Sequence, residues 1–151
     1  MKSSTKVVTL TLLLAIAAFV TEPHGPLGSF WAPSPDAPAA VGIQVPLFMI
    51  LGIVEALAFG LGVSFLFFGR SLLKAQGTAS ESLTRGAHLA ISWLLLNWWA
   101  HDSLHLHNGM HLNGLLMIEY GFHVTLIIAG ITLARYFLAV SSGPAPKAAG
   151  A

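Results

Sequence analysis

The chain contains no cysteine among its 151 residues, and only 9% of those residues are charged. The absence of cysteine excludes disulfide bonds and thiolate ligands, so a metal would be bound by imidazole, carboxylate or carbonyl groups. A formal net charge of +1 provides no basic patch, so we expect no nucleic-acid partner. Soluble domains carry about 25% charged residues. The low charge, the 55% apolar content and a mean hydropathy of +0.75 instead predict a membrane protein.

Four apolar segments alternate with polar or proline-rich stretches. We expect an all-α integral membrane protein, an antiparallel four-helix bundle with spans at about 4–21, 45–69, 85–107 and 113–139. The first segment has a second interpretation. Ala15 and Ala17 offer a site typical of signal-peptide cleavage, so residues 1 to about 18 could be removed, which would leave three helices. The sequence leaves both interpretations open.

The connecting segments set the expected order of the spans. Residues 22–44 are rich in proline and predict an extended external loop, which is either a connector or a lid over an external site. Asn108 and Gly109 predict the end of the third helix, and Asn113 is expected to cap the fourth, so these helices should be antiparallel neighbours. Residues 1–140 then form a single transmembrane domain. Residues 141–151, rich in Gly, Ala and Pro, predict a disordered cytoplasmic tail.

Basic residues occur in three places only: the N-terminus, the middle loop and the C-terminal end. They are Lys2, Lys6, Arg70, Lys74, Arg85, Arg135 and Lys147. The two segments between these places contain no Lys or Arg. Because basic residues favour the cytoplasmic side, both termini should be cytoplasmic in a multi-pass protein of the plasma membrane. The same rule puts the histidine-rich segment 101–111 on the extracytoplasmic side.

That segment reads HDSLHLHNGMH and carries the residues most suited to chemistry. His101 and His105 are one turn apart and share a helix face, a spacing with which a helix chelates a metal. Asp102 either orients His105 as a hydrogen-bond acceptor or is itself a ligand. His107 and His111 either complete a site by folding back or are solvated loop residues.

Ionisable residues on other helices fall at nearly the same height. Counted at about 1.5 Å per residue from the arginines, Glu55, His101 and Glu119 lie about 22 to 24 Å from the cytoplasmic ends. Glu119 and His123 also share one helix face. A carboxylate in hydrocarbon is costly unless compensated, and no basic residue lies at this level. The expected metal ligands are His101, His105, Glu119 and His123, with Glu55, Asp102 and His111 as further candidates.

Three further features need a separate interpretation. Glu55 stands alone on its helix and is either a ligand or a protonated carboxyl that bonds a neighbouring helix. His88 points about 130° away from His101, so we expect it to be a packed histidine bonded to a neighbouring helix. The motif HDSLH resembles the first histidine box of membrane fatty-acid desaturases and hydroxylases. Those families need further boxes that this chain lacks, so the resemblance extends only to histidine ligation.

These residues predict a metal site near the extracytoplasmic face that suits iron, copper or zinc. The expected function is that of a metal-dependent membrane oxidoreductase. One alternative is a non-enzymatic metal-transport protein or a subunit that binds a haem or pigment in a larger membrane complex. Another is a proton-responsive membrane protein whose histidines titrate. The expected partners are the lipid bilayer and either other membrane subunits or further copies of the chain.

Overall fold

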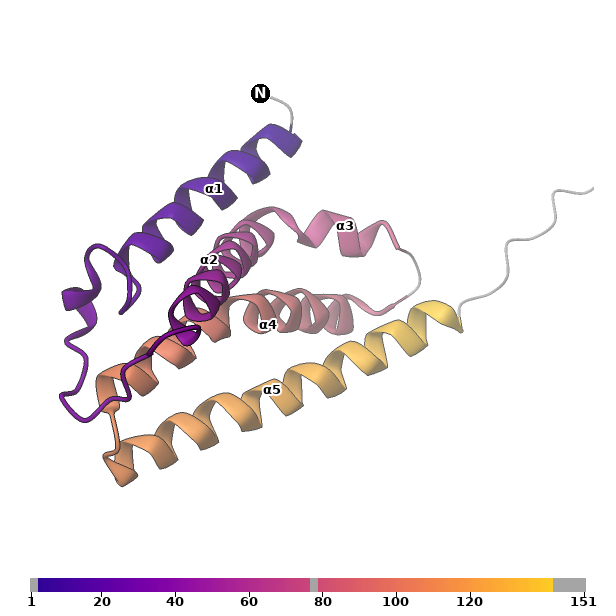
Figure 1. Ribbon diagram of the computed structural model, residues 1–151. Coiled ribbons are helices and arrows are strands. Elements are labelled where there is room, and N and C mark those ends of the chain that lie inside the picture. Colours follow the sequence, from indigo (N-terminus) through magenta and orange to yellow (C-terminus); the bar gives the residue numbers. More distant parts are fainter. Residues whose placement is uncertain (1–2, 77–78, 143–151) are drawn as a thin grey trace, which may run out of the picture.

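The computed structural model describes residues 3–76 and 79–142, and in this part all regular elements are helices (Figure 1). The prediction of an all-α fold is therefore confirmed. The predicted tail lies almost wholly outside the described residues. The elements are α1 (Ser3–Thr21), the 3-10 helix η1 (Gly28–Trp31), α2 (Gln44–Phe68), α3 (Arg70–Lys74), α4 (Glu81–Asn108) and α5 (Leu112–Ser141).

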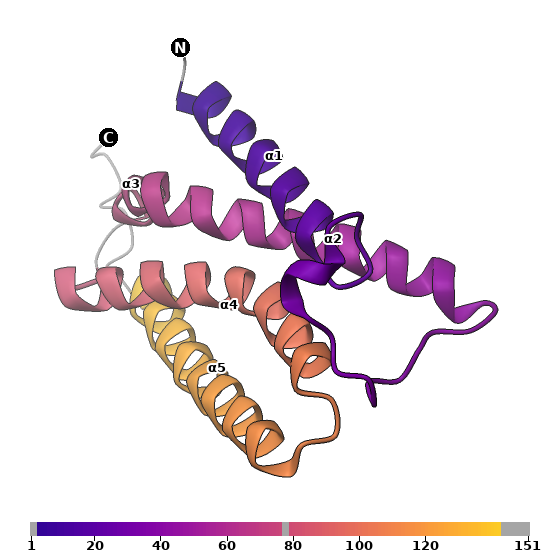
Figure 2. The same cartoon turned by 90° about the vertical axis from the view of Figure 1, so that its left-hand side faces the viewer.

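The four long helices pack in chain order: α1 on α2, α2 on α4, and α4 on α5. Figures 1 and 2 both show α1 and α5 on the two outer sides of this row. The start of α1, the short helix α3 and the end of α5 lie at one end of the molecule. The loop 22–43 and the turn 109–111 lie at the other end. The chain therefore reverses at each connection between long helices.

Helices α1 and α2 approach closely because α2 carries small residues at the interface. A Cβ atom at Gly60 would collide with the backbone carbonyl of Thr11. One turn further along α2, Ser64 accepts a hydrogen bond of 2.9 Å from the Thr11 hydroxyl. Ala56 is also fully enclosed. Small residues spaced by four on α2 thus allow the close packing of the two helices.

A compact ion-pair cluster closes the end of the molecule that holds α3. Glu81 pairs with Arg70, and its other oxygen lies 3.3 Å from Nζ of Lys74. Hydrogen bonds from Arg70 and Lys74 hold the pKa of the Glu81 carboxyl below its usual range. The Tyr136 hydroxyl donates to the carbonyl oxygen of Leu73 over 2.9 Å. These contacts fix α3 against the start of α4 and the end of α5.

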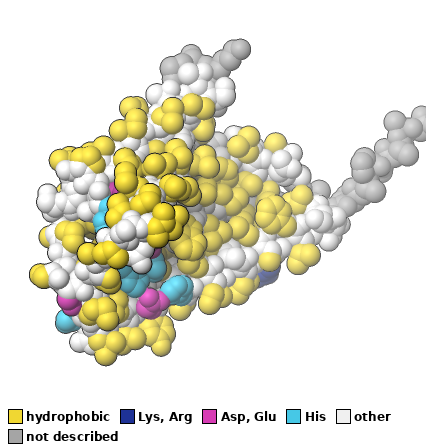
Figure 3. Space-filling model, in the orientation of Figure 1, with side chains coloured by type: hydrophobic (Ala, Val, Ile, Leu, Met, Phe, Trp, Pro, Cys, Tyr) yellow, Lys and Arg dark blue, Asp and Glu magenta, His cyan; other side chains and the backbone are white. Residues whose placement is uncertain are grey.

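Three described helices are long and apolar enough to cross a membrane: α1 from Ser4, α2 and α5. Their outer faces expose large apolar side chains, for example Leu13 at 61%, Phe67 at 69% and Ile127 at 62%. Figure 3 shows hydrophobic side chains over much of the visible surface. Apolar patches of this extent are rare on soluble monomers and are typical of surfaces covered by lipid or protein. The structure is therefore consistent with membrane localisation.

Helix α4 is not among these three, although the sequence predicted that residues 85–107 would also form an apolar span. It is too polar because it carries a series of buried polar residues between α2 and α5. These are Thr84, His88, Ser92, Asn97 and Ser103. Nε2 of His88 lies 2.9 Å from the carbonyl oxygen of Phe65 on α2, where it donates a hydrogen bond. The prediction of a packed His88 bonded to a neighbouring helix is confirmed.

The turn between α4 and α5 is shorter than the sequence predicted. Helix α4 ends at Asn108, and Gly109 follows with a φ of +57°, which favours glycine. Helix α5 begins at Leu112, and its N-cap is His111, whose Nδ1 accepts from the backbone N–H of Gly114. The prediction that Asn113 caps this helix was therefore wrong. It lies one residue inside the helix, because His111 already provides the cap.

Candidate metal centre

Aromatic packing between α4 and α5 sets the register in which the candidate ligands face one another. The rings of Trp93 and Phe122 stack with centroids 5.6 Å apart. Nε1 of Trp93 donates to the Thr125 hydroxyl over 3.0 Å. Because these contacts lie beside the histidines, the α4 face that bears His101 meets the α5 face that bears Glu119. The expected meeting of these two faces is thus found in the structure.

Three side chains form a group that could hold a metal ion. His101, Glu119 and His123 each offer one ligand atom, and these atoms all lie within 4.8 Å of one another. Nδ1 of His123 lies 2.7 Å from Oε2 of Glu119. The ring centroids of His101 and His123 are 5.6 Å apart. Imidazole and carboxylate donors at these separations could move onto one ion with small side-chain rotations.

His105 joins the same group from the next turn of α4. Its Nε2 lies 3.1 Å from Nε2 of His101 and 3.2 Å from Oε1 of Glu119. Two neutral imidazole nitrogens at hydrogen-bond distance must share a proton, because one has to donate and the other has to accept. A metal ion that displaces this proton would receive a lone pair from each ring. Four side chains therefore converge.

Asp102 forms a hydrogen bond with His101, which is adjacent in the sequence, and not with His105 as predicted. Its Oδ1 lies 2.9 Å from Nδ1 of His101, where it accepts a hydrogen bond from that nitrogen. The sequence favoured an interaction with His105, one turn further along. A proton on Nδ1 leaves Nε2 of His101 with its lone pair directed at the group. Histidines that bind metals commonly have such a carboxylate partner.

The group is enclosed on the α4 side and open on the α5 side. The exposed fraction of the side chain rises from 17% for His101 and 29% for His105 to 45% for Glu119 and 54% for His123. In Figure 3 histidine and acidic side chains gather at one end of the molecule, while the visible basic side chain lies towards the other. An ion could therefore reach the group without any opening of the fold.

Two of the further candidate ligands lie outside this group. His111 is occupied as the N-cap of α5. Glu55 is on α2, and with Asp102 it lines a cavity between α2 and α4, whereas Glu119 is on α5. Counting residues along the helices placed Glu55 at about the height of His101. It could not show which side of α4 Glu55 would contact.

The proline-rich loop is fastened to the outer end of α4. Nδ1 of His107 lies 2.6 Å from the carbonyl oxygen of Trp31, to which it donates. The N–H of Ser34 donates to the Leu106 carbonyl over 2.9 Å. Asp36 accepts from the Ser34 hydroxyl and from the N–H of Met110, and these bonds lower the pKa of its carboxyl. His107 is therefore a loop anchor in this structure.

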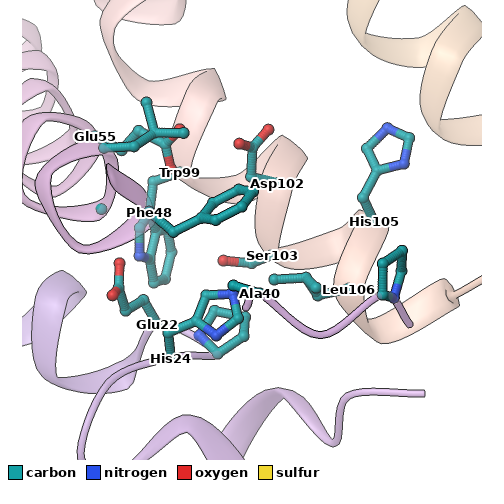
Figure 4. Close-up of a pocket in the computed structure, with 14 residues that line it drawn as sticks. Glu22, His24, Ala40, Phe48, Glu55, Trp99, Asp102, Ser103, His105 and Leu106 are labelled. Carbon is teal, nitrogen blue, oxygen red and sulfur yellow. The ribbon is translucent and has the colours of Figure 1, made fainter. Parts of the chain in front are cut away.

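Beneath the loop is a cavity of about 260 Å³ between the loop, α2 and α4 (Figure 4). Five ionisable side chains line it: Glu22, His24, Glu55, Asp102 and His105. Glu22 and His24 were not among the site residues predicted from the sequence. One sequence feature could have indicated Glu22: it directly follows an apolar helix, and no Lys or Arg lies near it in the sequence.

Comparison with known proteins finds no family model that matches the chain, no matching curated protein and no matching solved structure. The function is therefore inferred from the residues of the site and their geometry.

Proposed function

We propose that this chain is a multi-pass membrane protein that binds a metal ion near its extracytoplasmic face. The ligands are His101, His105, Glu119 and His123. The observation that carries the proposal is the convergence of His101, Glu119 and His123, whose ligand atoms lie within 4.8 Å of one another although they come from two helices. The hydrogen bond from His101 to Asp102 adds support, because it frees the other ring nitrogen for an ion.

In the proposed topology α4 also crosses the membrane, as the third of four spans, and it tolerates its polar residues because α2 and α5 cover it. Both termini are cytoplasmic and the protein lies in the plasma membrane. Two features support this orientation. Arg70, Lys74 and Arg85 lie at the end of the molecule with α3, and the histidine group lies towards the opposite end. We also propose that α1 is retained, since Trp99 on α4 donates a hydrogen bond to the carbonyl of Ala18.

The donor set suits iron, copper or zinc, because it combines imidazole and carboxylate without sulfur. We favour iron or copper and an oxidoreductase role. The exposure of Glu119 and His123 supports a reactive centre, since catalytic metals keep a coordination position open to water or substrate. Zinc at the same ligands would activate water instead, and a site that releases its ion readily would serve transport.

The geometry favours an ion over a haem. A haem held by His101 and His123 needs its porphyrin plane between the two imidazoles. In the structure the Glu119 carboxylate bonds His123 at 2.7 Å, and His105 lies 3.1 Å from His101. These contacts fill the space in which a porphyrin would have to lie.

Elemental analysis of the purified protein in detergent, with an absorption spectrum of the same sample, tests the proposal. We expect about one equivalent of iron, copper or zinc per chain and its loss in His101→Ala. His24→Ala is the matched control, because His24 is exposed and lies outside the ligand group. A metal-free protein that retains no added ion would contradict the proposal and favour the proton-responsive alternative. A Soret band would favour the haem-binding alternative.

A further inference from the structure

Three carboxyl groups and two imidazoles are the ionisable groups that line the cavity beneath the loop. Glu22, Glu55 and Asp102 contribute carboxyl groups from the end of α1, from α2 and from α4. No Lys or Arg is among the described residues that line the cavity. Buried carboxylates are costly unless a cation, a hydrogen-bond donor or a proton compensates them. The arrangement therefore fits a positively charged occupant.

Glu22 is the strongest indication of such an occupant. The residue is only 6% exposed, and its side chain faces the cavity (Figure 4). Its carboxylate has no hydrogen-bond partner among the described residues, and burial raises the pKa of this carboxyl. The carboxylate lies directly against α2 at Gly52, where any side chain would collide with it. The fold thus makes room for a buried, unpartnered acid.

The occupant is not expected to be a metal ion. In the described part of the chain, one group brings three ligand atoms within 4.8 Å of one another, and this group lies between α4 and α5. Glu22, Glu55 and Asp102 are not part of it. The carboxyl groups of Glu55 and Asp102 interact with each other, and with Glu22 they line a space of about 260 Å³. A space of this volume suits a cation larger than a bare ion.

The remainder of the lining is apolar and partly aromatic. Phe48 on α2 and Trp99 on α4 face the same space as Leu51 and Leu106. The Trp99 ring is held in place by Phe59, with centroids 4.7 Å apart. Aromatic faces attract organic cations, and apolar walls favour a ligand with a hydrocarbon body.

From these observations we propose that the cavity is a binding site for a small organic amine. Its ammonium group pairs with Glu22 and Glu55, and its hydrocarbon part packs on Phe48 and Trp99. The site does not depend on the metal, although Asp102 and His105 belong to both places. A bound amine would therefore lie between α2 and α4, next to the group that carries the metal ligands.

Benzylamine is a suitable probe, because it combines an ammonium group with a ring, and benzyl alcohol is its neutral counterpart. The full chain in detergent at pH 7 is titrated with each compound while tryptophan fluorescence is recorded. Trp99 lines the cavity and serves as the reporter. We expect saturable binding of benzylamine, and at least about tenfold weaker binding of benzyl alcohol, since the alcohol cannot form a charge-assisted bond.

Glu22→Gln should weaken benzylamine binding by about tenfold or more while the metal content stays unchanged. Gln retains the shape of the side chain and removes a buried charge, so the variant should fold. Glu55→Gln is the second variant and should act in the same direction. Glu81→Gln, at the other end of the molecule, is the matched control and should bind as the native chain does.

Three outcomes would overturn the proposal. Equal binding of benzyl alcohol would identify an apolar cavity without selectivity for cations. Unchanged binding in both Glu22→Gln and Glu55→Gln would remove the role of the carboxyl groups. A second equivalent of metal that is lost only in Glu22→Gln would identify a second metal site. None of these outcomes alters the metal content expected of the His101 group, so the two proposals fail separately.

Discussion

Oδ1 of Asp102 lies 2.9 Å from Nδ1 of its neighbour His101. The two residues are adjacent on α4, yet the carboxylate determines which ring nitrogen carries the proton. With the proton on Nδ1, the lone pair of Nε2 faces His105, 3.1 Å away, and the group that Glu119 completes. A hydrogen bond between neighbouring residues thus prepares a ligand for a site that depends on a different helix.

Replacement of Asp102 by Asn should weaken metal binding by about 10-fold to 100-fold, the usual effect of losing a carboxylate partner of a metal-bound histidine. The Asn oxygen can still accept from Nδ1, but it lacks the charge that raises the basicity of the ring. Competition with a chelator of known affinity measures the change. Asp36→Asn is the matched control, since Asp36 bonds the loop and not a candidate ligand. Equal affinities in both variants would contradict this role.

The contact between α1 and α2 should be sensitive to one methyl group. Gly60→Ala places a Cβ against the Thr11 carbonyl, so the helices must separate, and we expect a loss of about 1 to 3 kcal/mol in stability. At Gly130 on α5 a Cβ would meet nothing within 4 Å. Gly130→Ala should therefore be neutral or stabilise by up to about 1 kcal/mol. Thermal unfolding in detergent compares the two variants, and equal midpoints would contradict the packing.

Single-cysteine labelling tests the orientation, because the chain has no native cysteine. Met110→Cys lies in the exposed turn between α4 and α5, and Ser71→Cys lies on the exposed side of α3. A membrane-impermeant thiol reagent added to intact cells should label position 110 and should label position 71 only after permeabilisation. The reverse pattern would mean that the histidine group faces the cytoplasm.

The proline-rich loop should detach from the end of α4 at acid pH, when Asp36 becomes protonated. Its bonds to Ser34 and Met110 lower the pKa of the carboxyl from the usual 3.8. The ionised form therefore stabilises the folded loop. This contribution is fully present above the unfolded value and is lost as the pH falls through the lower folded value.

Hydrogen exchange followed by mass spectrometry detects this release. The protection factor of the Ser34 amide, which donates to the Leu106 carbonyl, should fall below pH 3.8 in the native chain. Asp36→Asn should show the reduced protection already at neutral pH and little further change. Protection that does not vary with pH in the native chain would show that Asp36 is not the anchor.

Much of the fold could be predicted from hydrophobic runs and helix-stop residues. Asn108 and Gly109 end α4 as expected, because glycine accepts the positive φ that the turn requires. The sequence predicted an apolar span at 85–107, and α4 is more polar than that prediction. Backbone carbonyls satisfy these polar residues: His88 bonds Phe65 on α2, and Asn97 bonds Trp93 on α4 itself. The contact between two helices is invisible in one sequence.

The candidate site was predictable where helical periodicity decided the geometry. His101 and His105 share one face, as do Glu119 and His123, so their convergence required only that α4 and α5 meet. Periodicity could not show that Asp102 reaches back to His101, since that depends on side-chain rotation. It also gave no indication of Glu22, whose position depends on how the chain folds back after α1.

The X-ray absorption spectrum of the metal-bound protein, recorded at the edge of the metal found, tests the central claim most directly. The account predicts imidazole nitrogen and carboxylate oxygen ligands at about 2.0 to 2.2 Å, with no sulfur shell. His123→Ala should remove one imidazole contribution, because His123 is one of the converging ligands. A spectrum that shows oxygen ligands only, or one that is identical in His123→Ala, would contradict a centre shared by α4 and α5.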